Sequence, residues 1–242
     1  LTNQLKVFVK ICELDPRTPF ARDIAIRSNT QSAVNSRNLR ALDGPQLRLT
    51  DEFKSRFPDI TYETRPDKSL DSSHSIIQNH QAARCLCAVM NRRPWLAIKN
   101  LSLFDDPNYA AIFNEDVHAE QVFFCSTIRE LVDEDRDRFP ASYRRSWVLT
   151  SIIATYLAAE ALRALRNDED LHSLAEAWVE ETEVHQKDIE IAIDAARKTL
   201  ELRRDDHQLN DIVDDFKVDF KNEGVLRKLG GKAREVAIIL RD

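Results

Sequence analysis

Hydrophobic residues follow two different spacings along this chain. In residues 5–13, Val7, Val9 and Ile11 occupy every second position, which is typical of a β-strand, and residues 60–64 form a second strand pattern. Elsewhere apolar residues recur every three or four positions, as on one face of a helix. On that spacing we expect helices that begin at Thr18 or Pro19 and at Ser36, and helices over residues 46–57, 76–90, 94–103, 107–114, 117–133, 141–165, 168–202, 211–220 and 225–240, the last broken near Gly230-Gly231.

This order of elements predicts a small α/β part followed by a helical part. The polar loop at residues 67–73 separates them, so we expect an α/β subdomain over residues 1–66 and a multi-helix domain over residues 74–242. The chain has only 4 glycines in 242 residues, and sheets need glycine for turns and bulges, so helix is favoured. We therefore expect a mostly α (α+β) fold with the most apolar helix, residues 141–165, at the centre of the core.

The composition, with 43% hydrophobic and 31% charged residues, is that of a globular protein. We expect four reduced, buried cysteines in a cytoplasmic protein: Cys12, Cys85, Cys87 and Cys125. On this pattern we expect no apolar run that approaches the length needed to cross a bilayer, and no membrane association. The chain starts at Leu1 without an initiator methionine, and we expect further sequence upstream.

The net charge of −6 is unevenly distributed. Residues 1–100 contain 16 Lys and Arg against 10 Asp and Glu, a net charge of +6, so the remaining residues carry 19 against 31, a net charge of −12. Such an asymmetry is typical of a nucleic-acid-binding surface in one half and a solvated or protein-facing scaffold in the other.

Residues 25–49 are rich in arginine and amide side chains, with no acidic residue between Asp23 and Asp43. Arginine, asparagine and glutamine supply directed hydrogen bonds to phosphates, base edges or a partner backbone, and two short helices beside Asp43 would have the length of a helix-turn-helix. Alternatively, the amides cap helices and the arginines pair with nearby acids. The residues expected to bind nucleic acid or a partner are Arg27, Asn29, Gln31, Arg37, Asn38, Arg40, Gln46 and Arg48.

Short motifs follow one another along the chain: Val7-Phe8-Val9-Lys10-Ile11, Asn29-Thr30-Gln31, Arg37-Asn38-Leu39, Gln46-Leu47-Arg48-Leu49, Ile60-Thr61-Tyr62-Glu63-Thr64-Arg65, Tyr109-Ala110-Ala111-Ile112-Phe113-Asn114 and Asp219-Phe220-Lys221-Asn222. In order and spacing they resemble the abortive-infection phage-resistance (AIPR) family of prokaryotic defence proteins, in its C-terminal portion. The motifs span most of the chain but are sparse after about residue 139. The resemblance implies a cytoplasmic role in phage resistance, a form of antiviral defence. It implies no catalytic mechanism, because the family is characterised mainly by its association with defence.

Candidate catalytic and metal sites are weak by comparison. Glu115-x-x-His118 and Glu169-x-x-His172 have the spacing of di-iron bundles, but both pairs lie at expected helix starts, where acids favour the helix dipole. Carboxylate-x-Lys steps, as in nucleases, also fall in helical patterns; they are Glu52-Phe53-Lys54, Asp215-Phe216-Lys217 and Asp219-Phe220-Lys221. The four glycines cannot build a phosphate-binding loop. We expect no metal and no cofactor, and the catalytic residues, if any, are unknown.

Three functions remain open. We favour a defence component whose α/β part binds DNA, RNA or another defence-system protein, with the helical domain as scaffold and homo-oligomer surface. The second is a nuclease-type enzyme of a restriction-like system, with catalytic residues partly upstream of Leu1. The third is a structural adaptor whose interface is the apolar stripe of residues 168–202: Leu171, Leu174, Trp178, His185, Ile189, Ile193 and Leu200.

Overall fold

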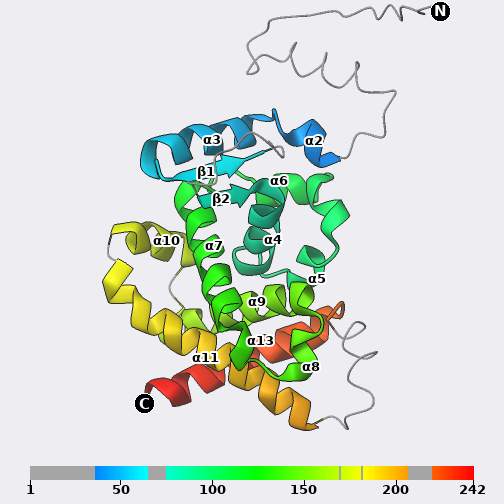
Figure 1. Ribbon diagram of the computed structural model, residues 1–242, viewed down its shortest axis with the longest axis vertical. Helices are drawn as coiled ribbons and strands as arrows, with labels where there is room; N and C mark the ends of the chain where they lie inside the picture. Colours follow the sequence, from blue (N-terminus) through cyan, green and yellow to red (C-terminus); the bar gives the residue numbers. More distant parts are fainter. Residues whose placement is uncertain (1–35, 65–74, 169, 181, 207–219) are drawn as a thin grey trace, which may run out of the picture.

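The computed structural model describes residues 36–64, 75–168, 170–180, 182–206 and 220–242. Over these residues the chain is mostly α-helical with a two-stranded parallel sheet, which confirms the expected fold class (Figure 1). Three expected elements lie outside the described part, wholly or nearly so. They are the strand over residues 5–13, the helix that begins at Thr18 or Pro19, and the helix over residues 211–220. The elements are α2 (Ser36–Arg40), α3 (Gly44–Arg56), β1 (Ile60–Glu63), β2 (Ser75–Gln78), α4 (Asn79–Val89), α5 (Pro94–Ala97), η1 (Asn100–Phe104), α6 (Asn108–Ile112), α7 (Ala119–Glu134), η2 (Asp135–Arg138), α8 (Ala141–Arg144), α9 (Trp147–Leu165), α10 (Leu171–Glu180), α11 (Thr182–Asp206) and α13 (Glu223–Arg241).

Helix α3 covers the small sheet. On α3, Leu49 and Phe53 are buried one turn apart, and the Phe53 ring stacks on Tyr62 of β1 with 5.4 Å between ring centroids. Strands β1 and β2 pair in parallel, with Tyr62 opposite Ile77. The domain boundary expected at residues 67–73 therefore falls between two paired strands, and one hydrophobic cluster contains residues from both sides of it.

Helix α4 begins later than the sequence pattern predicted. Residues 76–78, expected to be helical, belong to strand β2, and the helix starts at Asn79. A short apolar pair such as Ile76-Ile77 fits either period, and pairing with β1 satisfies its backbone hydrogen bonds in the extended form. The buried Asn79 side chain donates to the Thr64 carbonyl over 3.1 Å, so it ties the start of α4 to the end of β1.

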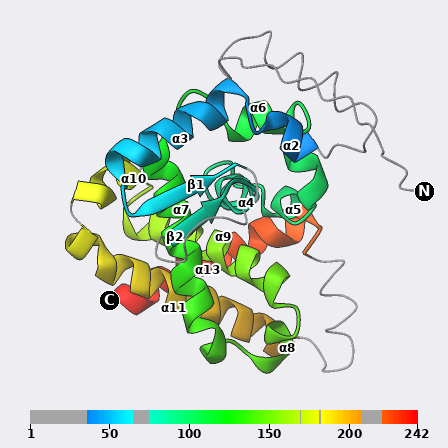
Figure 2. The same ribbon diagram turned by 45° about the horizontal axis from the view of Figure 1, so that its top comes forward.

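Helix α9 is the centre of the core, as its sequence predicted. Nearly all its residues from Thr150 onward are buried, because α11 and α13 pack along it and α4 and α7 cover a further face (Figures 1 and 2). The helix expected from residue 141 is interrupted, since α8 ends at Arg144 and α9 begins at Trp147. The Thr150 hydroxyl donates to the carbonyl of buried Tyr143 over 2.8 Å, which holds the turn between the two helices.

Among the described residues, helix α9 alone is long and apolar enough to cross a membrane by length and composition. This corrects the expectation that no run reaches that length. In the structure 83% of its most apolar window is buried inside the protein. A core helix of this kind passes the same test, so the finding is weak evidence for a membrane span.

The apolar stripe over residues 168–202 is divided between two helices rather than carried by one. Helix α10 packs against α7, whereas α11 packs against α9 and α13. The apolar periodicity continues from α10 into α11, but the two halves of the stripe pack against different helices. Its members with described side chains are buried: Leu171, Leu174, Trp178, Ile189, Ile193 and Leu200.

Helix α13 runs without interruption through Gly230-Gly231, so the predicted break there is wrong. A Cβ atom on Gly230 would lie 2.5 Å from the Tyr156 hydroxyl of α9, whereas one on Gly231 would meet nothing within 4 Å. Glycine at position 230 therefore allows α13 to approach α9 closely. The pair of glycines marks a packing contact and not the end of a helix.

Candidate functional site

Five of the eight residues expected to bind nucleic acid or a partner are described by the structure. They lie on or beside α2 and α3: Arg37, Asn38, Arg40, Gln46 and Arg48. The other three lie outside the described residues: Arg27, Asn29 and Gln31. The structure brings Arg40 and Arg48 to one open cleft of about 420 Å³ between α3 and α6, with Tyr109 and Phe113 in its lining.

The arginines of α2 make several contacts within the chain. Arg40 donates to the Asp43 and Asp106 carboxylates over 3.0 and 2.6 Å, and its guanidinium lies 4.6 Å from the centre of the Tyr109 ring. Arg37 donates to the Asn79 side chain over 2.6 Å. These contacts connect α2 to α4 and to the segment that leads into α6.

The expected residues on α3 also make internal contacts. Arg48 donates from Nη2 to the carbonyls of Asn114 and Val117 over 3.0 and 2.7 Å, so it fastens α3 to the loop before α7. Gln46 is fully buried and accepts a 2.8 Å hydrogen bond from the Tyr62 hydroxyl. Together with Arg40, these side chains follow the alternative in which the polar residues hold loops and pair locally. Their role in binding remains a prediction.

In the Glu-x-x-His pair at residues 115–118, the histidine contacts the carboxylate of Glu52 on α3. His118 Nδ1 lies 2.9 Å from Glu52 Oε1, and the other oxygen of Glu52 accepts from the Ala119 backbone N–H over 2.8 Å. Glu52 therefore caps the start of α7 from a neighbouring helix. Within the described ranges, no group of three or more His, Cys, Asp or Glu is arranged to hold a metal ion.

The described cysteines agree with the expectation of free, buried thiols. Cys85, Cys87 and Cys125 are all buried and unpaired in disulfides, and burial raises the pKa of the Cys87 thiol to about 12. A thiol with such a pKa remains protonated and is a poor nucleophile. Cys12 lies outside the described residues.

A buried cluster of charges lies where α4, α9 and α13 meet. Glu160 of α9, only 1% exposed, accepts from Arg92 over 2.6 Å and from Arg163 over 2.8 Å. Burial lowers the pKa of Arg163, although the Glu160 charge opposes that shift. Burial, followed by the Glu160 charge, raises the pKa of the adjacent Tyr156 hydroxyl to about 12. The buried charge of Glu160 on this apolar helix is therefore balanced by arginine side chains.

His80, near the start of α4, faces several positive charges. Burial lowers its pKa from 6.5 to about 4, and the guanidinium groups of Arg37, Arg84 and Arg129 act in the same direction. The imidazole is therefore neutral at pH 7.

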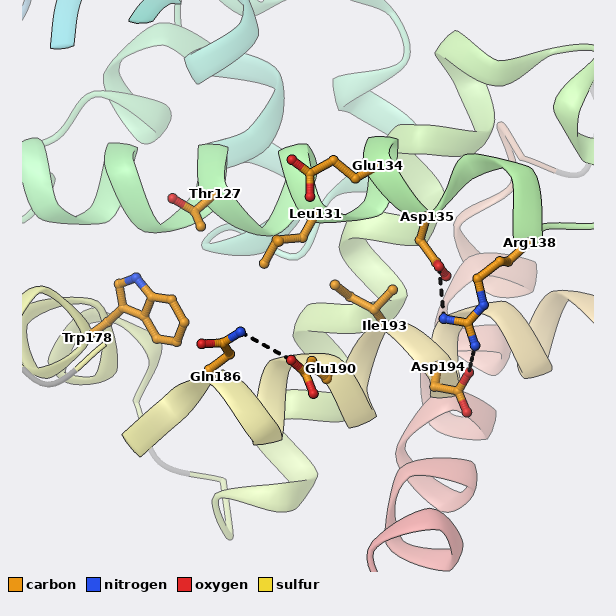
Figure 3. A pocket seen from close by; sticks show the side chains of 10 residues that line it. All are labelled: Thr127, Leu131, Glu134, Asp135, Arg138, Trp178, Gln186, Glu190, Ile193 and Asp194. Atoms are coloured by element: carbon orange, nitrogen blue, oxygen red, sulfur yellow. Dashed lines mark hydrogen bonds and ion pairs between the residues drawn. The ribbon is translucent and has the colours of Figure 1, made fainter. Parts of the chain in front are cut away.

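A second cavity, of about 440 Å³, is the stronger candidate for a binding site, and we call it the α7–α11 groove (Figure 3). Helices α7 and α11 form its two walls, and Trp178 of α10 lies at one end. Three of its ten lining residues are apolar, Leu131, Trp178 and Ile193, and the other seven are polar or charged. A concave site of this size that combines apolar surface with polar groups is a common form of binding site.

The groove carries acidic residues on both walls. The lining contains one cation, Arg138, and four carboxylates: Glu134, Asp135, Glu190 and Asp194. Arg138 lies 2.9 Å from Asp135 and 3.6 Å from Asp194, so it links the walls at the end opposite Trp178 (Figure 3). Glu134 and Glu190 are exposed on opposite walls, and none of the described cations pairs with either. The site therefore combines apolar surface with two exposed carboxylates, Glu134 and Glu190, that have no described counter-cation.

Periodicity predicted only part of this groove. Trp178 and Ile193 belong to the apolar stripe of residues 168–202, which the sequence predicts as an interface of an adaptor. The acids flanking the stripe, Glu190 and Asp194, were a usable signal, because they lie four residues apart on one helix face. The α7 wall required the tertiary structure. Comparison of the chain with protein-family models, with curated proteins and with solved structures finds no match.

Proposed function

We propose that this protein is a partner-binding module that holds a basic amphipathic helix of another protein in the α7–α11 groove. The observation that supports it is the combination of apolar surface with exposed carboxylates on both walls. An amphipathic helix fits such a groove through apolar anchors on one face. Lysine or arginine on its flanks would pair with Glu134 and Glu190. On the resemblance to the AIPR family, the partner belongs to an anti-phage defence system.

The dimensions of the groove agree with this partner. On α11 its lining extends from Gln186 to Asp194, eight helical steps, or about 12 Å at 1.5 Å per residue. Anchor residues at positions i and i+7 of a bound helix span roughly 10.5 Å. Two turns of a partner helix can therefore place three apolar anchors between Trp178 and the Arg138 link.

The other functions considered from the sequence receive less support from the described residues. Several guanidinium N–H groups already donate hydrogen bonds within the chain, and they belong to Arg37, Arg40 and Arg48. A nuclease centre would require converging acids, and the described part of the chain contains no cluster that could hold a metal ion. The groove is the feature that supports a binding role directly.

The test uses a fluorescein-labelled peptide of leucine and lysine, about 14 residues or roughly four helical turns long, and its leucine–glutamate counterpart. We expect the lysine peptide to raise its fluorescence anisotropy on binding and the glutamate peptide not to do so. The variant Glu134→Lys/Glu190→Lys should weaken lysine-peptide binding at least about tenfold, since it places like charges on both walls. The same variant should gain affinity for the glutamate peptide.

A matched control separates the groove from the overall negative charge. Asp59→Lys/Asp116→Lys changes the net charge equally at two exposed positions outside the groove. It should bind the lysine peptide almost as well as the unaltered protein. Equal weakening in both double variants would show that attraction is nonspecific and would refute the proposal.

A further inference from the structure

Positive charge collects where α5 meets the start of α13. Residues 75–104 contain four Lys and Arg and no Asp or Glu, and residues 220–234 contain five Lys and Arg against one acid, Glu223. The segments touch: the Arg227 guanidinium lies 5.3 Å from the centre of the Trp95 ring, and both overall views show α5 beside the first turns of α13 (Figures 1 and 2). In a chain of net charge −6, these segments form a separate basic surface.

We call the exposed part of this surface the basic corner and define it by Arg92, Arg93, Trp95, Arg227 and Lys228. Arg93 and Lys228 are exposed, and neither side chain pairs with an acid of the described chain. Arg227, 59% exposed, pairs at the surface with Glu223, a contact that solvent screens strongly. The corner therefore presents cations that an external anion can reach.

Arg92 is held at this corner by an unusual backbone. Its φ of 55° is in the left-handed region, three residues after the last residue of α4, in the turn that ends the helix, where glycine or asparagine is the common choice. In this conformation its half-exposed side chain reaches buried Glu160, which is 1% exposed. The acid lies inside the protein and the guanidinium reaches the surface, so the pair exposes mainly positive charge.

We infer that the basic corner binds the phosphate backbone of single-stranded nucleic acid, with the Trp95 ring and the Arg227 guanidinium that lies over it together forming the stacking surface for a base. The cations are distributed over two segments of the surface instead of converging in one cavity, which suits a chain of phosphates more than a single anion. Partly exposed aromatic rings beside cations are the usual means of holding unpaired bases. This surface is distinct from the α7–α11 groove and does not depend on the function proposed for it.

The probe is a fluorescein-labelled oligothymidylate or oligouridylate of about 20 nucleotides, which exceeds the site size of a small domain. Anisotropy titrations over a salt series should show affinity that falls as salt rises. Arg93→Glu/Lys228→Glu should reduce the slope of log K against log salt by about 1.4, since each single-strand phosphate contact contributes roughly 0.7. Lys54→Glu/Lys187→Glu, which reverses two exposed cations elsewhere, should leave that slope unchanged.

The stacking surface has its own readout. Trp95→Leu should lower affinity with little effect on the salt slope, because it removes stacking and no charge, whereas Trp95→Phe should restore much of the loss. Circular dichroism checks that each variant is folded. The inference is overturned if neither oligonucleotide binds, or if both charge-reversal variants bind equally. Tighter binding of a duplex overturns the single-strand assignment, and equal binding of polyglutamate indicates an acidic protein partner instead.

Discussion

Replacing each of the adjacent glycines of α13 by alanine should change stability in different ways. At position 230 the new Cβ would lie 2.5 Å from the Tyr156 hydroxyl oxygen and 3.0 Å from its Cζ, so α13 or the ring must move. Forcing an extra carbon into a packed core costs about 1–3 kcal/mol. At position 231 nothing lies within 4 Å, and alanine in a helix is more stable than glycine by about 1 kcal/mol.

The gain in helix propensity is common to both variants, so their difference isolates the packing cost. We expect Gly231→Ala to be more stable than Gly230→Ala by about 2 kcal/mol. For a chain of this length that difference corresponds to roughly 4–8 °C in the midpoint of thermal unfolding. Differential scanning calorimetry measures it. Adding Tyr156→Phe to Gly230→Ala should recover part of the loss by removing the nearest atom, and equal stability of the two single variants would refute the assigned contact.

Two further predictions concern charge. The pKa of His80 is about 4 in the folded protein and about 6.5 when unfolded, so the unfolded chain binds more protons between these values. The contribution of neutral His80 to stability should be fully present above pH 6.5 and should be lost as the pH falls toward 4. The variant His80→Gln should therefore flatten the pH dependence of the thermal unfolding midpoint. An unchanged pH profile would contradict the assignment. Glu160→Gln should lower the free energy of unfolding in urea by about 3 kcal/mol, because buried Arg163 loses its counter-charge. A loss below about 0.5 kcal/mol would show that the cluster is not coupled to stability.

The fold class and most helices could be predicted because hydrophobic periodicity reports burial directly. Helix α3 and strand β1 lie where expected, since Leu49 and Phe53 share one helix face and residues 60–63 are β-formers. The errors occurred where a tertiary contact decides between two local options. Ile76-Ile77 becomes a strand because β1 is beside it, and Gly230 lies within a helix that packs closely on Tyr156.

The candidate sites were less predictable for a different reason. Composition shows which side chains can bind an anion, but it does not show whether their donors are already used. Arg48 donates to backbone carbonyls more than 60 residues away along the chain, a distance at which no local pattern can report a partner. The α7–α11 groove and the basic corner each combine segments remote in sequence, so neither could be recognised from one stretch of residues.

The burial of α9 also has a consequence for how the chain is made. This helix is complete at Leu165, but its cover includes α13, which ends at Arg241, 76 residues later. At about 5–20 residues per second, translation of that interval takes roughly 4–15 s. Throughout that time the most apolar segment of the chain lacks part of its final covering. A nascent chain stopped before α13 should therefore depend on chaperones that shield hydrophobic surface, whereas the finished protein should not.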